Sequence, residues 1–159
     1  MLSACSTFSS NVCKGPDFVR CDLRGVDLSG RQLNGRNLSF ANLQGADVSG
    51  ASFIGANLEG VTLDGANLEG ANFTGAFLGS SRFSEANARN VTFVGADLST
   101  AFFWRADLRG ANFADAKLTR AIFSYANLAG ANLVGADVRE AEFSDTILEG
   151  TAIDPERGN

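Results

Sequence analysis

The side chains that could carry out chemistry in this chain are few and form no reactive set. The chain has no histidine, one tyrosine and three cysteines. No group of His, Cys, Asp or Glu has the spacing of a metal site, and no nucleophile has a visible base partner. Glycines recur every five residues, but no phosphate-binding G-x-x-x-x-G-K-S/T motif occurs. The sequence predicts a protein that is not an enzyme and has no catalytic site, cofactor or metal.

The three cysteines, Cys5, Cys13 and Cys21, all lie at the start of the chain. We expect these cysteines to be small buried residues of an N-terminal cap. The alternative is a disulfide between two of the three, which would point to an oxidising compartment. Residues 2–5 also have the pattern of a bacterial lipoprotein box, although no signal segment stands before it.

Composition and charge narrow the class of protein. The chain has 159 residues, enough for one domain, and a net charge of −5, which argues against nucleic acid as a partner. No apolar run is long enough to span a membrane, and residues 1–15 lack the features of a signal peptide. We expect a cytoplasmic location; a periplasmic, lumenal or lipoprotein location is the alternative if the N-terminus has been trimmed.

A strict period of five residues organises the chain between positions 16 and 155. The central residue of each pentad, at positions 18, 23, 28 and onward to 153, is Leu in fifteen of twenty-eight pentads and Phe in nine. Two places earlier, eighteen of the twenty-eight are Ala, and the last place is Gly in fifteen. This period fits neither an α-helix nor a flat strand. It predicts short extended stretches with a bend at each pentad, central and Ala side chains facing inward, and Gly supplying the positive φ of a type II turn.

The distribution of phenylalanine predicts the size of one coil. Sorted by a period of twenty, eight of the nine central Phe residues fall into two columns that lie ten residues apart, and Phe18 lies in a third column. Four pentads per turn would give this result, with two opposite walls of stacked rings at a spacing of about 4.8 Å. The expected stacks are Phe53, Phe73, Phe93 and Phe113 on one wall, and Phe83, Phe103, Phe123 and Phe143 on the other.

These units, such as ANLEG at 56–60 and ADLRG at 106–110, resemble the pentapeptide repeat family. The resemblance implies an all-β fold, a right-handed quadrilateral parallel β-helix, here with about seven coils of four pentads. It divides the chain into a cap segment at 1–15, the repeat solenoid at 16–155 and a short polar tail at 156–159. It also implies a binding or scaffolding module, and one branch of the family mimics DNA and protects DNA gyrase from quinolones.

Departures from the repeat are the places where function is expected. Between 80 and 125, Gly is replaced at the last place of eight pentads, and we expect a different type of turn there. Large apolar residues occupy outward places in the same region: Phe102, Trp104, Ile122 and, at a corner, Tyr125. The first alternative is that these side chains fill grooves between coils. The second is that they form a protein-contact patch.

Three further expectations concern the ends and the polar positions. Arg31 and Arg36 take the small inward place, and we expect their charged groups to reach water or, as the alternative, to form a basic patch with Arg20 and Arg24.

Asp or Asn stands before the central residue in sixteen pentads, and we expect these side chains to bond to the backbone of neighbouring coils. The short tail cannot cover the last coil. We therefore expect either a homodimer through the C-terminal coil or a tail that folds over at Pro155.

Two functions follow from these observations. The first is a non-catalytic protein–protein interaction scaffold whose partner the sequence does not name. The alternative is a DNA-mimicking inhibitor of DNA gyrase. It is weakened by the modest net charge and by the absence of a C-terminal helix and of loops interrupting the coils, which that branch usually carries.

Overall fold

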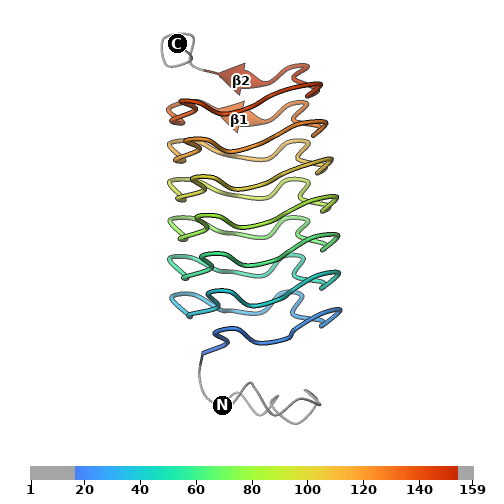
Figure 1. The fold of residues 1–159 in the computed structure, drawn as a ribbon, viewed down its shortest axis with the longest axis vertical. Coiled ribbons are helices and arrows are strands. Elements are labelled where there is room, and N and C mark those ends of the chain that lie inside the picture. The colour runs from blue at the N-terminus through green and yellow to red at the C-terminus, as the bar shows by residue number, and fades with distance from the viewer. Residues whose placement is uncertain (1–16, 154–159) are drawn as a thin grey trace.

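The computed structural model describes residues 17–153, and over this range the backbone winds into a stack of coils (Figure 1). The residue before each central position forms a parallel bridge with the residue one coil later, from Asp22 with Asn42 to Asn127 with Ile147. Two longer strands, β1 (Asn132–Leu133) and β2 (Ala152–Ile153), pair in parallel in the same register. This uniform register of twenty residues confirms four pentads per coil and the parallel β-helix.

Four flat faces follow from the register, and we name them by the position of the bridging residue. Face A has its bridging residues at 22, 42, 62, 82, 102, 122 and 142. Face B starts at 27, face C at 32 and face D at 37, each repeating every twenty residues. Each face ends at a corner residue, the last of its pentad. Faces A and C lie on opposite sides of the coil because their residues are half a coil apart.

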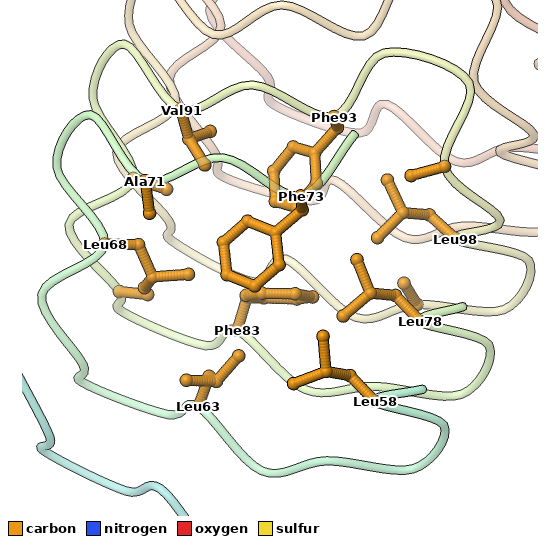
Figure 2. Packing of buried hydrophobic residues seen from close by; sticks show 14 of the residues in the cluster. Leu58, Leu63, Leu68, Ala71, Phe73, Leu78, Phe83, Val91, Phe93 and Leu98 are labelled. Atoms are coloured by element: carbon orange, nitrogen blue, oxygen red, sulfur yellow. The ribbon is translucent and has the colours of Figure 1, made fainter. Parts of the chain in front are cut away.

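The core is a continuous column of central and Ala side chains. The rings of Phe53 and Phe73 stack at 4.8 Å between centroids, and those of Phe83 and Phe103 stack at 4.6 Å. Rings of the two columns also meet edge to face, as Phe83 and Phe93 do at 5.8 Å. Figure 2 shows this arrangement, with Leu58, Leu78 and Leu98 lined up along the neighbouring wall. Ala in the small inward place leaves room for the rings of both columns to interlock.

Every amide of a regular pentad has a hydrogen-bond partner. In the pentad at 41–45, the amide of Ala41 closes the turn to Leu38 O, and that of Asn42 bonds to Cys21 O in the previous coil. The amides of Leu43 and Gly45 bond to the next coil. The remaining amide, that of Gln44, donates to Asn42 Oδ1 at 3.1 Å. The Asp or Asn therefore completes the hydrogen bonding of the backbone.

This bond corrects our expectation for the Asp and Asn residues. In fifteen pentads their side chain accepts the amide two residues later in the same coil, not an amide of a neighbouring coil. Contacts with the next coil are mostly between side chains, such as Asn87 Nδ2 to Asn67 Oδ1 at 3.0 Å. The sixteenth residue, Asp17, bonds as expected, because its Oδ1 accepts the amide of Asn37 in the next coil at 3.2 Å.

The prediction of a different turn at corners without Gly was wrong. Twelve non-Gly corner residues have φ between 54° and 62°, and the fifteen Gly corners have φ between 61° and 77°. Tyr125 and Glu85, for example, adopt the left-handed conformation that was expected only of Gly, with φ of 62° and 58°. The reason is the register: a different turn in one coil would break the pairing of both neighbouring coils. The stack therefore imposes one turn on all corners, at a cost of about 1 kcal/mol for each non-Gly residue.

The two ends of the described chain differ. Leu23, Leu33 and Leu38 of the first coil are buried, whereas Leu148 and Ile153 of the last coil are 44% and 47% exposed. Phe143, the last ring of its stack, is only partly buried. The expected cap at 1–15 and the polar tail lie outside the described residues. Cys21 is buried and disulfide-bonded, and Cys5 and Cys13 lie outside the described residues, so the pairing stays a prediction.

Candidate protein-contact face

Face A is where the chain departs most from its own repeat. It is bordered by two rows of corners, one at 20, 40 and onward to 140, and one at 25, 45 and onward to 145. Ten of these fourteen corners are non-Gly residues with positive φ. Only two of the other thirteen described corners are non-Gly, Asn90 and Asp115. Backbone strain in this protein is therefore concentrated along the two borders of one face.

Face A also lacks the side chain that completes the backbone hydrogen bonding. Its bridging residues at 82, 102, 122 and 142 are Arg, Phe, Ile and Glu in place of Asp or Asn. Within the described part of the chain, the amides of Trp104, Ser124 and Ser144 consequently have no hydrogen-bond partner. On face B, Asp or Asn occupies six of the seven equivalent positions. Over the same coils, face A therefore lacks two stabilising features of the repeat, which are Gly at the corners and Asp or Asn before the central residue.

The apolar residues expected to form a contact patch lie on this face. Phe102 and Ile122 are bridge partners in consecutive coils, and both are half-buried, as is Trp104. Tyr125, at the corner, is 55% exposed. The patch is thus an apolar surface made mostly of half-buried side chains, and its most exposed member is Tyr125.

Arginine side chains lie over two of these aromatic rings. The guanidinium of Arg105 lies 4.4 Å from the centre of the Trp104 ring, and that of Arg82 lies 5.9 Å from the centre of Phe102. Arg82 also pairs with Asp64 at 2.9 Å, whereas Arg105 forms no ion pair with any described residue. Aromatic rings with stacked arginines are typical of the side chains that dominate protein–protein interfaces.

Ion pairs engage seven of the eleven Lys and Arg residues and six of the sixteen Asp and Glu residues between 17 and 153. Seven ion pairs join described residues, all of them at least partly exposed, such as Arg89 with Asp107 at 2.7 Å. The Arg139 guanidinium donates to both oxygens of Asp137 and holds the pKa of that carboxyl well below its usual range. Arg31 is exposed and Arg36 is half-buried. The Arg31 side chain thus reaches water, which was the first of the two expectations for Arg31 and Arg36.

The sequence of the repeats places the chain in a family. A family model described as "Pentapeptide repeats" matches residues 32–70, 66–105, 89–124 and 121–154, with eight copies. The chain belongs to the pentapeptide repeat family, and its fold is the right-handed quadrilateral β-helix of that family. No protein in the curated comparison matches.

Several solved structures resemble the chain. A pentapeptide repeat protein from the Arabidopsis thaliana thylakoid lumen is 31% identical, over 67% of this chain and 68% of its own, with a TM-score of 0.35. A pentapeptide repeat protein from Nostoc Pcc 7120 is 34% identical, over 58% of this chain and 69% of its own, with a TM-score of 0.36. A trypsin-treated form of QnrB1, a plasmid-mediated fluoroquinolone resistance protein, is 20% identical, over 82% and 86%, with a TM-score of 0.48. The family assignment rests on the repeats and the coil register.

No helix long and apolar enough to cross a membrane occurs between residues 17 and 153. The cytoplasmic location stays a prediction.

Proposed function

We propose that this protein is a non-catalytic scaffold that binds another protein through face A, around Phe102, Trp104, Ile122 and Tyr125. The observation that supports the proposal is the concentration of ten strained corners on the borders of this one face. Strained backbone persists where the surrounding structure enforces it and where the side chain has a use. A Gly at each of these corners would be the more stable choice for the fold alone.

The composition of the face suggests the kind of partner. Face A presents aromatic and aliphatic side chains between arginines in its middle coils, and Glu140, Glu142 and Asp145 in the coil that follows. This mixture of apolar and oppositely charged groups fits a protein surface better than a uniformly charged polymer. Arg105 is the charged group best placed to meet a carboxylate of the partner, because it has no ion-pair partner among the described residues.

The experiment compares protein capture by three forms of the immobilised rod. The double variant F102N/W104S returns one coil of face A to the ordinary repeat, since Asn at 102 can accept the amide of residue 104 and Ser occupies the position of Trp104 in the next two coils. The control R109S removes a large side chain from the adjacent pentad on face B. Captured proteins from a lysate of the source organism are quantified by mass spectrometry.

The expected result is that the wild type and R109S retain a set of proteins that F102N/W104S loses. Urea unfolding should show F102N/W104S to be at least as stable as F102A/W104A, because a regained hydrogen bond contributes about 1 kcal/mol. This measurement separates loss of a contact from loss of the fold. If F102N/W104S captures the same proteins as the wild type, face A is not the binding surface.

The alternative, a DNA-mimicking gyrase inhibitor, has less support from the surface charges. Mimicry of DNA needs rows of unpaired negative charge, with about one charge per 1.7 Å of length. Here the seven ion pairs occupy six of the sixteen carboxylates between residues 17 and 153, and face A carries several arginines. We expect no change in DNA supercoiling by purified gyrase when the protein is added at micromolar concentration. Inhibition would favour the alternative over the scaffold.

A further inference from the structure

Face C differs from the other three faces in carrying almost no charge. Arg31, in the first pentad of face C, is exposed, but across the five coils that follow, at 51–55, 71–75, 91–95, 111–115 and 131–135, the only charged residue is Asp115. The five pentads that precede these on face B contain five charged residues, and the five that follow them on face D contain seven. Asp115 is a corner residue at the edge of the face, where its Cγ lies close to the corner at Gly135. The middle of face C is therefore uncharged from residue 51 to residue 135.

An apolar ridge runs along this uncharged face. The residues after the central position are, in successive coils, Ile54, Thr74, Val94, Ala114 and Val134. Ile54 and Val134 are 43% and 50% exposed. Apart from Asn90 and Asp115, the corners that border face C in these coils are glycines, so few corner side chains stand between this ridge and an approaching surface.

Several polar groups of face C already have hydrogen-bond partners, although the amide of Val94 has none among the described residues. Asn72 Oδ1 accepts both the amide and the hydroxyl of Thr74, and Asn132 Nδ2 donates to Asn112 Oδ1 at 3.2 Å. Ser52 Oγ donates to Asn34 Oδ1 at 2.6 Å. Burial of a polar group is expensive mainly when its hydrogen bonds to water are lost without replacement. Face C can lose water with few such losses.

We propose that face C binds face C of a second copy of this chain. In a twofold dimer the same patch meets itself, so like charges on that patch would be brought together. Face C avoids this repulsion between residues 51 and 135, whereas faces A, B and D each carry several charges. Two flat β surfaces with interleaved Ile, Val and Thr side chains pack about 10 Å apart, as in stacked sheets.

The open C-terminal end is the competing surface for a second copy, and its charges disfavour it. Leu148 and Ile153 are exposed there, but Glu142, Asp145 and Glu149 lie in the same coil. Two such ends facing one another would bring both sets of carboxylates close together. This end-to-end pairing should strengthen as salt screens the charges, whereas pairing through face C should be nearly independent of salt.

A dimer through face C has a consequence for the scaffold, which rests on the function proposed above. Because faces A and C are on opposite sides of the coil, the two copies of face A would point away from each other. The dimer would then present two binding faces and gain avidity for a partner that carries two sites. The patch is small, roughly 300 Å² per copy if five coils span about 24 Å, so we expect a weak, concentration-dependent dimer.

The test is sedimentation velocity from about 10 μM to about 1 mM, a range that resolves weak dissociation constants. The face C variant is I54E/V134E. The matched control S29E/A129E adds the same charge at equivalent positions on face B, and L148E places a charge at the C-terminal end. Thermal unfolding of each variant shows that the fold is intact.

We expect the wild type, S29E/A129E and L148E to dimerise alike, and I54E/V134E to dimerise about tenfold more weakly or not at all. A monomer at every concentration would overturn the proposal. So would an I54E/V134E variant that dimerises like the wild type, or a dimer that only L148E abolishes. Because none of these variants touches face A, loss of the dimer with retained protein capture would leave the proposed function standing.

Discussion

Faces A and B are adjacent in every coil, have the same backbone and the same register, and yet follow the repeat to different degrees. Face B keeps Asp or Asn before the central residue in six coils, and Gly at every corner that ends it except Asn90. Face A has Arg, Phe, Ile and Glu in successive coils and non-Gly residues along both borders. The difference shows that a solenoid can hold an irregular surface as long as its neighbouring faces stay regular, because each coil is fixed by the coils on both sides.

The largest loss of stability should follow from a substitution on the inward side of face A. Phe103 stacks between Phe83 and Phe123, with ring centroids 4.6 and 4.8 Å away, whereas its neighbour Phe102 faces outward. We expect Phe103→Ala to lower the free energy of unfolding by about 3–5 kcal/mol and Phe102→Ala by about 1 kcal/mol. Urea unfolding of the two variants measures the difference. Equal losses would mean that the outward aromatic residues belong to the core.

A smaller effect is expected where a corner of face A meets a ring. A Cβ atom at Gly60 would lie 2.6 Å from the Phe40 ring, whereas one at Gly70 on face B meets nothing within 4 Å. Both glycines have positive φ, so Gly→Ala should cost about 1–2 kcal/mol at either corner. Gly60→Ala should cost about 1 kcal/mol more because Phe40 must move.

The double variant F40A/G60A isolates this contact. In a double-mutant cycle, removal of the Phe40 ring should bring the cost of the alanine at residue 60 close to that of Gly70→Ala. A cost of Gly60→Ala that is unchanged by removal of the ring would show that the ring imposes no constraint.

Strain on the borders of face A predicts a stabilising change of modest size. Glu85 has a φ of 58°, so Glu85→Gly should raise the free energy of unfolding by about 1 kcal/mol. Asn90→Gly on face B should have less effect, because Asn tolerates the left-handed conformation better than other non-Gly residues. Thermal melting compares both with the wild type. Destabilisation by Glu85→Gly would argue against strain at this corner.

The smallest change in stability should follow from lowering the pH, and it should arise on face B. Hydrogen bonds from Ser49, from its side chain and from its amide, hold the pKa of Asp47 below its ordinary value. A carboxylate with a lowered pKa in the folded state stabilises the fold at neutral pH, and this stability is lost as pH falls through the acidic range. The melting temperature should therefore be level near neutral pH and fall below about pH 4.

Asp47→Asn serves as the control for this titration. Asn keeps an acceptor for the Ser49 amide, as it does at Asn67 in the next coil, but cannot titrate. The variant should therefore lose less stability on acidification than the wild type. An identical acid profile for the two proteins would exclude Asp47 as a contributor.

The sequence by itself determined the fold, the coil size and the two columns of phenylalanine, because a period that never slips leaves one way to bury every fifth side chain. It also located the irregular coils and the outward residues Phe102, Trp104, Ile122 and Tyr125. The conformation of the irregular corners was decided by the tertiary structure, since pairing with both neighbouring coils forces Glu85 and Tyr125 into the turn that Gly would otherwise adopt. The stack also decided that the strained corners border one face, because residues twenty apart become neighbours only when the coils close.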